Sequence, residues 1–423
     1  MRKTNVIRLV PDNEARLVLK AVADRVSAPW DAANYICRQA FIKGEKVPNY
    51  SVLCAVMKDT PDYRALPTHI GQEVLKKLGK SWASFFGLRR VHTAGRLKDR
   101  PGLAKYRKDR KKNARACDYI PVKSPLAYRV EGSVIYLAMP GDIRAGRMAI
   151  PFRGVIRHRG EPKTCELQYD NVNQGWYAHL VVECPEREPM KPRPVKHAGG
   201  DIGARRIITI SVEDNPLSVI YSSRAAWKDY KYWSRRIAEE KSRLSTQGYK
   251  TSRYLQGLYR KRRLRLRHAM EALASGVVNQ LMWQRVTYFT VGYPVNCRDD
   301  AWFGRGNELV HNFWSYEILL SLLERHSVRR GIVFERANER GTSSHCHICG
   351  RKVTRPRTDT VVCKIHGPMQ ADVNASKNIL GKKTPAMAGD GEKASLVWAV
   401  MRWDTHRWLS HAESANNRVL RAA

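Results

Sequence analysis

The chain has 423 residues, 43% of them hydrophobic, which is enough apolar material for several folded domains and excludes a disordered basic tail. Its 76 Lys and Arg residues against 39 Asp and Glu residues give a formal net charge of +37, which favours a polyanionic partner because each neutralised phosphate releases counterions. No apolar run of about 18 residues and no signal peptide is found in the sequence, so we expect no membrane partner and a cytoplasmic location.

The first half of the chain divides into a helical part and a part rich in short strands. Residues 5–11 predict a strand, and the apolar spacing that follows predicts helices through most of residues 14–95. Short alternating segments over residues 118–184 predict a small β-barrel or sandwich, which the first strand completes. We therefore expect a β-barrel domain from residues 1–13 and 96–190, and a helical domain from residues 14–95.

Two segments are too basic for a core and are interpreted as nucleic-acid contacts. Residues 105–117 hold seven cations, and residues 259–268 lie in a long helical tract and hold six. Either segment alone is compatible with an ordinary solvated surface, but on a chain of this charge a phosphate-binding role is favoured. The residues selected are Lys105, Arg107, Arg110, Arg260, Lys261, Arg262, Arg263, Arg265 and Arg267.

The second half begins after a proline-rich stretch, residues 185–197, which is the best domain boundary. The predicted elements then run strand, strand, strand, helices, strand, helix, strand, a cysteine-rich segment and a last helix. This is the order of an RNase H-like fold, so the expected fold class is α+β with several domains. We expect this domain to comprise residues 196–342 and 372–385, with an insertion at residues 343–371 and a helical tail at residues 386–423.

The insertion carries the strongest local motif in the chain. Of nine cysteines only the last three cluster, where a C-x-x-C and a C-x-x-H, each followed by glycine, lie a short distance apart. Two such pairs fit a tetrahedral structural zinc site, because each pair binds from a tight turn and four protein ligands leave no open position. His345 and His347 are alternative ligands whose positions fit the turn less well. The predicted ligands are Cys346, Cys349, Cys363 and His366.

Two aspartates are candidate catalytic residues. Asp201 follows two glycines in GGDIGARR, and Asp372 opens the segment DVNASKNIL. Singly, Asp201 is compatible with a turn at a strand end and Asp372 with a helix N-cap. Taken together, at the first strand and the last helix of an RNase H-like order, they fit a two-metal phosphodiesterase in which carboxylates hold Mg²⁺.

The motifs GGDIGARR, TSSHCHICG with its second Cys/His pair, and ADVNASKNIL resemble the RuvC domain of TnpB, the RNA-guided nuclease encoded by transposons, and of compact type V CRISPR effectors. The resemblance covers most of the chain, with the first half matching only in texture. It implies that the β-barrel is a wedge domain, that the helical domain is a recognition domain, and that the second half is a RuvC domain with an inserted zinc finger. It also implies Asp201 and Asp372 as catalytic residues, Mg²⁺ as the catalytic ion, and a prokaryotic source.

The middle catalytic acid departs from the commonest family pattern. Many relatives carry a Glu after the fourth strand, where this chain has Gly292. Some relatives carry it instead just before the Thr-Ser that precedes the zinc finger, which implies Glu339 here, with Glu335 as the alternative. A Glu on a neighbouring loop can direct its carboxylate at the same metal pair. Gly292 equally leaves open an inactive site.

The expected function is an RNA-guided DNA endonuclease that uses a guide RNA to select target DNA and cuts it at a single RuvC site. The alternative is a nuclease-deficient RNA-guided DNA-binding protein that acts as a repressor or silencing effector. A third hypothesis is a guide-independent zinc-ribbon protein that binds nucleic acid. The sequence leaves open whether the chain is a monomer or a homodimer, and whether the guide comes from a CRISPR array or a transposon.

Overall fold

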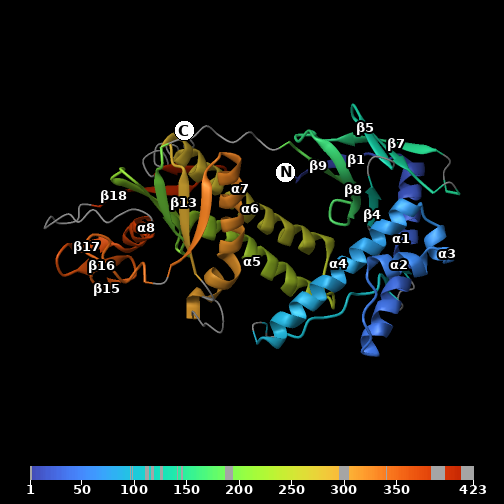
Figure 1. The fold of residues 1–423 in the computed structure, drawn as a ribbon, viewed down its shortest axis with the longest axis horizontal. Coiled ribbons are helices and arrows are strands. Elements are labelled where there is room, and N and C mark those ends of the chain that lie inside the picture. Colours follow the sequence, from blue (N-terminus) through green and yellow to red (C-terminus); the bar gives the residue numbers. More distant parts are fainter. Residues whose placement is uncertain are drawn as a thin grey trace. The chain divides into compact units, whose positions relative to one another are not determined.

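The computed structural model describes residues 2–410 apart from residues 96, 98, 110–113, 116–118, 124–126, 141, 144–145, 186–193, 295–303, 340 and 383–395. The chain forms two compact units, an N-terminal unit, Met1–Glu186, and a C-terminal unit, Arg187–Ala423 (Figure 1). The division falls within the proline-rich stretch that the sequence marked as a boundary. No described helix is long and apolar enough to cross a membrane.

Four helices follow the first strand in the N-terminal unit. The longest, α1, begins where it does because the Asp12 side chain accepts a hydrogen bond from the backbone N–H of Ala15 at 2.8 Å and so caps the first turn. Helix α1 packs on α4, where the buried indole N–H of Trp82 donates to Oδ1 of Asn34 at 3.1 Å. The helices are α1 (Asn13–Ile42), α2 (Tyr50–Met57), α3 (Pro61–Arg64) and α4 (Thr68–Thr93).

A seven-stranded antiparallel sheet completes this unit, in the order β4-β8-β9-β1-β7-β6-β5. The first strand lies in its centre. The edge strands β4 and β5 do not pair with each other, so backbone hydrogen bonds do not close the expected barrel among the described residues. The strands are β1 (Arg2–Leu9), β4 (Tyr119–Lys123), β5 (Tyr128–Glu131), β6 (Val134–Ala138), β7 (Arg147–Arg153), β8 (Glu161–Asp170) and β9 (Gly175–Glu183), beside a separate pair, β2 (Lys108–Asp109) and β3 (Ala114–Arg115).

Helices and sheet of the N-terminal unit share one hydrophobic core. Leu19 of α1, Leu78 of α4 and Ile135 of β6 are all fully buried in it. Residues 14–95, which the sequence set apart as a helical domain, therefore share a core with the sheet, while α1 and α4 also pack on each other through Phe41, Trp82 and Phe85.

The C-terminal unit is built on a second seven-stranded sheet, in the order β14-β13-β10-β11-β12-β18-β19. Strand β11 is antiparallel to both of its neighbours, β10 and β12, whereas β13 runs parallel to β10 and β14 parallel to β13. The strands other than β18 and β19 are β10 (His197–Asp201), β11 (Arg206–Val212), β12 (Leu217–Ser222), β13 (Tyr288–Tyr293) and β14 (Val333–Asn338).

The helices of this unit and a three-stranded sheet in the insertion, which the sequence predicts to be a zinc finger, follow the order expected from the sequence. The helices are α5 (Arg224–Thr246), α6 (Arg253–Trp283), the short turns η1 (Gly304–Gly306) and η2 (Leu309–Phe313), α7 (Tyr316–Arg329) and α8 (Ala371–Gly381). The zinc-finger strands are β15 (Thr354–Arg357), β16 (Thr360–Cys363) and β17 (Gly367–Gln370).

The prediction of a helical tail at residues 386–423 is wrong for the described part of that tail. Residues 396–410 form β18 (Val397–Trp403) and β19 (Trp408–Ser410), and β18 pairs in parallel with β12. The apolar and aromatic side chains of this segment suit a strand, and β18 covers what is otherwise the open edge of β12. Trp403 and Leu409 are buried as a result.

Candidate functional site

Gly199, the first of the two glycines before Asp201, lets helix α8 rest directly on strand β10. A Cβ atom at Gly199 would lie 2.3 Å from the carbonyl oxygen of Ser376 and 2.6 Å from the backbone nitrogen of Leu380, both in α8. No larger residue fits there unless the helix moves. The helix that carries Asp372 is thereby held against the strand that ends at Asp201.

Three carboxylates gather at the end of β10. Asp201 closes that strand, Asp372 lies in the first turn of α8, and Glu339 follows directly after β14. Burial raises the pKa of Asp201 well above its ordinary value, the negative charges of Asp372 and Glu339 raise it further, and Arg355 opposes the shift. Burial also raises the pKa of Glu339, to about 6. The structure therefore brings together all three residues that the sequence and its resemblance selected.

Gly292 lies beside this cluster. Strands β10 and β13 pair Gly200 with Val291, so continuing the register by one residue sets Asp201 beside Gly292. A Cβ atom at Gly292 would lie 3.2 Å from Cβ of Glu339 and 2.6 Å from Cδ1 of Ile379. Glu339 thus borders the space that a side chain at position 292 would fill.

Glu335, the alternative middle acid, has a different environment. It stands opposite Thr290 in the pairing of β13 with β14, and the Thr290 hydroxyl donates to its Oε2 at 3.2 Å. Glu335 is not among the charges that shift the pKa of Asp201, whereas Glu339 is.

The carboxylate of Asp372 faces the site rather than capping its own helix. Gln370 is the N-cap of α8, because its Oε1 accepts from the backbone N–H of Val373 at 2.6 Å. Oδ2 of Asp372 accepts from Nη1 of Arg206 at 2.6 Å and from Nε2 of Gln370 at 2.8 Å. Sequence reasoning missed Arg206, although it stands in the same GGDIGARR motif as Asp201.

The four predicted zinc ligands form one cluster. The ligand atoms of Cys346, Cys349, Cys363 and His366 all lie within 4.8 Å of one another. Sγ of Cys349 and Sγ of Cys363 are 3.7 Å apart, and Nδ1 of His366 lies 3.5 and 3.6 Å from the sulfurs of Cys346 and Cys363. Tetrahedral zinc with ordinary bond lengths requires S–S distances of about 3.8 Å and S–N distances of about 3.5 Å, so the cluster fits that ion.

Burial and the turn backbone shift the pKa values of two of the cysteines in opposite directions. Burial opposes ionisation of Cys363, but the backbone N–H groups of His366 and Ile365, with further side-chain hydrogen bonds, bring its pKa down to about 6. Burial raises the pKa of Cys346 to about 11. Gly350 and Gly367 follow the two ligand pairs and have φ values of 67° and 76°. Residues with a side chain rarely adopt this left-handed conformation, so glycine is favoured at both positions.

The two other histidines in the motif bind helix α8 instead of joining the cluster. The backbone N–H of His347 donates to Oδ1 of Asn374 at 2.9 Å, and burial lowers the pKa of its ring to about 4. Nδ2 of Asn374 donates to the carbonyl oxygen of His345 at 2.8 Å, and Asn378 donates to the same oxygen at 2.8 Å. The zinc-finger segment is thus tied to the helix that carries Asp372.

The first basic segment is partly anchored. Lys105 is exposed, but the guanidinium of Arg107 lies 4.0 Å from the ring centre of Trp30, and its backbone N–H donates to Asp31 at 2.7 Å. Arg107 therefore stacks within the protein. Arg110 lies outside the described residues.

Some cations in the basic stretch of α6 have partners within the protein, and others are exposed. Nε of Arg265 donates to Oδ2 of Asp229 at 2.7 Å, Arg262 donates to Ser234 at 2.9 Å, and Lys261 lies over Trp233. Arg260 is half-buried, whereas Arg263 and Arg267 are exposed, one helical turn apart. This last pair is best placed to meet a phosphate backbone.

Two protein-family models match the chain. Residues 179–298, which contain Asp201, match the model OrfB_IS605, described as a probable transposase, and residues 316–379, which contain Glu339, the zinc ligands and Asp372, match the Cas12f1-like TNB domain. The TnpB-like protein ORF457 of Acidianus two-tailed virus is 26% identical over 424 residues, covering 93% of this chain and 89% of that protein. These similarities confirm the resemblance to TnpB and the compact type V effectors.

Two of the solved structures that match this chain are of RNA-guided systems. The mini-RNA-guided endonuclease CRISPR-Cas_phi3 shares 9% identity, with 93% of this chain and 94% of that chain covered and a TM-score of 0.49. The Cas12f1–sgRNA–target DNA complex shares 14% identity, with 90% and 100% covered and a TM-score of 0.36. Neither likeness carries over the role of any residue.

Proposed function

We propose that this protein is an RNA-guided DNA endonuclease that hydrolyses DNA at one RuvC site. The observation that carries the proposal is the meeting of Asp201, Glu339 and Asp372, from three elements far apart in the chain, at the end of one central strand. Carboxylates are seldom gathered in a half-buried position unless they hold cations.

The sheet topology supports assignment of the C-terminal unit to the RNase H-like fold. Five of its seven strands run in the order β12-β11-β10-β13-β14, in which β11 is antiparallel to both of its neighbours, and β13 and β14 run parallel to β10. A carboxylate at the end of the central strand β10 and another at the start of α8, which packs on that strand, are where a nuclease of this fold needs them. Because a fold alone does not imply an activity, the argument rests on the carboxylates.

The carboxylate cluster suits Mg²⁺, which prefers oxygen ligands. Burial is the main cause of the raised pKa of Asp201, and the negative charges of Asp372 and Glu339 add to it; a bound cation would favour the ionised form of all three carboxylates. Asp201, Glu339 and Asp372 would hold the ion, and Mg²⁺, when bound, activates water and stabilises the leaving oxygen. Arg206 and Gln370 orient the Asp372 carboxylate by their hydrogen bonds.

Glu339 is the proposed middle ligand. Its Cβ borders the space above Gly292, and its charge acts on Asp201, whereas the Glu335 carboxylate is engaged by Thr290. A side chain at position 292 would collide with Ile379, which lies at 2.6 Å. Gly292 therefore leaves room beside Asp201, and Glu339, from the loop after β14, borders that room in place of an acid at position 292.

The proposed partners are a guide RNA and a target DNA. The net charge of +37 and the exposed cations of α6 support a polyanionic partner, and the relatives named above support an RNA-guided system. We also propose that the Cys346 cluster holds a structural Zn²⁺, because its sulfur and nitrogen spacings match that ion.

The test is cleavage of DNA matching the RNA that co-purifies with the protein, in Mg²⁺ and in EDTA. Asp201→Ala and Asp372→Ala should each lower the cleavage rate by several orders of magnitude and keep guided DNA binding, because they remove metal ligands and not the recognition surface. Glu339→Gln should behave likewise, with Glu335→Gln as the matched control that retains cutting. If Glu335→Gln loses activity while Glu339→Gln keeps it, the assignment of the middle ligand is wrong and the nuclease proposal survives.

A second candidate function is RNA-guided DNA binding without cleavage, and Gly292 is the observation that favours it. Guided binding in a gel-shift assay, with no cutting or nicking by the unaltered protein in Mg²⁺ or Mn²⁺, would establish this function and refute the nuclease proposal.

A further inference from the structure

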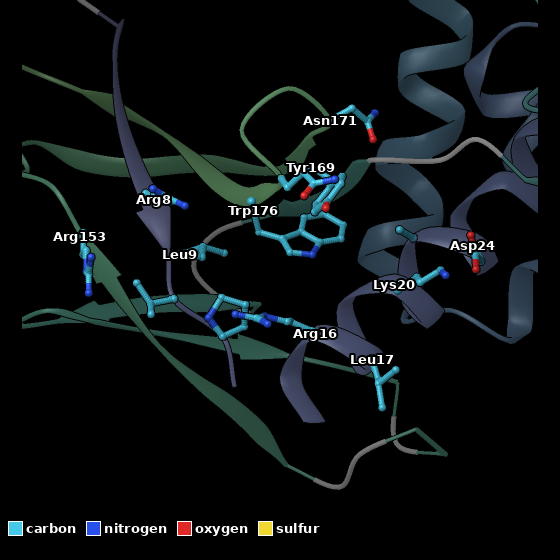
Figure 2. A pocket seen from close by; sticks show the side chains of 15 residues that line it. Arg8, Leu9, Arg16, Leu17, Lys20, Asp24, Arg153, Tyr169, Asn171 and Trp176 are labelled. Atoms are coloured by element: carbon cyan, nitrogen blue, oxygen red, sulfur yellow. The ribbon is translucent and has the colours of Figure 1, made fainter. Parts of the chain in front are cut away.

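A cavity of about 710 Å³ lies in the N-terminal unit, and none of the candidate site residues named above lines it. The first turns of α1, strands β1 and β7, and the β8–β9 hairpin form its walls (Figure 2). Its volume is in the range of sites that enclose small organic ligands.

Four cations in the cavity wall form two like-charged pairs. Arg8 of β1 stands directly opposite Arg153 of β7, and Arg16 and Lys20 lie one turn apart on α1. Like charges at either spacing destabilise a sheet or helix. Within the described residues none of the four makes an ion pair or a side-chain hydrogen bond, and one carboxylate, Asp24, lines the cavity with them. All four side chains are exposed, so solvent screens part of their repulsion, and they are accessible to an anion.

Apart from Asn171 and Gln174, the remaining side chains of the wall are aromatic or apolar. The rings of Tyr169 and Trp176 lie 5.4 Å apart at 61°, and Figure 2 shows them between Arg8 and Lys20. Leu17 is 70% exposed and Val10 38% exposed, although both line the cavity. A lone phosphate makes no use of such a surface, whereas a nucleobase does, because it packs on aromatic and aliphatic side chains.

We propose that this cavity binds a single unstacked nucleotide, with its base against Tyr169, Trp176 and Leu17 and its phosphates on Arg8, Arg153, Arg16 and Lys20. The chemistry is shared by a nucleotide extruded from RNA and one extruded from DNA. A nucleotide within a strand has a phosphate on each side, so one phosphate would contact Arg8 and Arg153 and the other Arg16 and Lys20. The site would fix the register of the bound strand at one position while the rest of the surface tracks its backbone.

The proposal rests on the proposed function only in taking nucleic acid as the polyanion, and it is tested without any cleavage. Adenosine 5′-monophosphate, adenosine and inorganic phosphate are titrated separately into the full-length protein by calorimetry. The monophosphate should bind about tenfold more tightly than either fragment, since each fragment lacks one class of contact. Equal affinity for phosphate and the monophosphate would overturn the proposal, and so would no binding of the monophosphate.

Cross-linking then places the nucleotide and distinguishes its source. Single strands of one sequence, an RNA with 4-thiouridine and a DNA with 5-iododeoxyuridine, are irradiated with the protein, and cross-linked peptides are mapped by mass spectrometry. We expect a cross-link within the peptide that contains Tyr169 and Trp176, in the RNA, the DNA or both. Cross-links confined to other segments would overturn the assignment of this cavity.

Matched double variants separate the cavity from overall charge. Arg8→Gln with Arg153→Gln should lower monophosphate binding and the cross-link yield at least about tenfold. The control is Arg2→Gln with Arg147→Gln, which removes the same charge from exposed positions of the same two strands, outside the cavity. The control should match the unaltered protein. Equal losses in the two variants would show a general charge effect and refute the site.

Discussion

We expect one added methyl group at Gly199, two residues before Asp201, to disable the proposed nuclease site. In Gly199→Ala the new Cβ would lie 2.3 Å from the carbonyl oxygen of Ser376, whereas ordinary contact begins at 3.4 Å. This oxygen and the backbone nitrogen of Leu380, the two nearest atoms, belong to the helix backbone and cannot rotate away. Helix α8 must therefore withdraw from β10 by about 1 Å, the difference between these two distances.

The withdrawal should affect activity more than stability. Asp372 lies one turn before Ser376 on the same helix, so its carboxylate moves with the backbone. A displacement of about 1 Å in a catalytic group can cost about 10²-fold in rate. Overpacking of this kind costs about 1–3 kcal/mol of stability, and in a unit of this size each kcal/mol lowers the Tm by about 2–4 °C.

The assay compares guided cleavage, guided DNA binding and thermal unfolding of Gly199→Ala with those of Gly276→Ala. Gly276 lies on the exposed side of α6, and a Cβ there meets nothing within 4 Å. The control should cut normally and gain up to about 1 kcal/mol in helix stability. If Gly199→Ala cuts DNA at the unaltered rate with an unchanged Tm, α8 does not rest on β10 as described, and the reasoning is refuted.

Three further predictions concern the zinc finger and the basic helix. Cys349→Ala should lower the zinc content from one ion per chain to none by metal analysis, together with the Tm and the cleavage rate; zinc retained in the variant would contradict the ligand assignment. Asn374→Ala should keep its zinc but lose about 1 kcal/mol of stability and part of the cleavage rate, because it leaves the backbone N–H of half-buried His347 without its acceptor, whereas the carbonyl oxygen of His345 still accepts from Asn378; unchanged unfolding would contradict the link to α8. Arg263→Gln with Arg267→Gln should weaken DNA binding at all sequences and flatten its salt dependence, whereas Arg265→Gln, which breaks an internal ion pair, should mainly lower the Tm; equal salt slopes in all three proteins would mark this helix face as solvated only.

The sequence itself determined the features that depend on short spacing. The four predicted zinc ligands follow from two pairs of residues with a fixed spacing in the sequence. The glycine after each pair adopts the positive φ that such turns need. The order of strands and helices in the C-terminal unit followed in the same way from local periodicity. Family motifs added Asp201, Asp372 and Glu339, although no local rule distinguished them from turn and cap residues.

Only the tertiary structure decided how the distant residues meet. The choice between Glu339 and Glu335 depends on the space beside Gly292 and on the pairing of β13 with β14, neither of which is present in any short segment. The strand β18 escaped prediction because its partner β12 is remote in sequence, and pairing with an open sheet edge overrode the expected helix. The like-charged pair of Arg8 and Arg153 arises from strand register alone. Contacts of this kind are fixed by packing and long-range pairing, which the local order of residues does not encode.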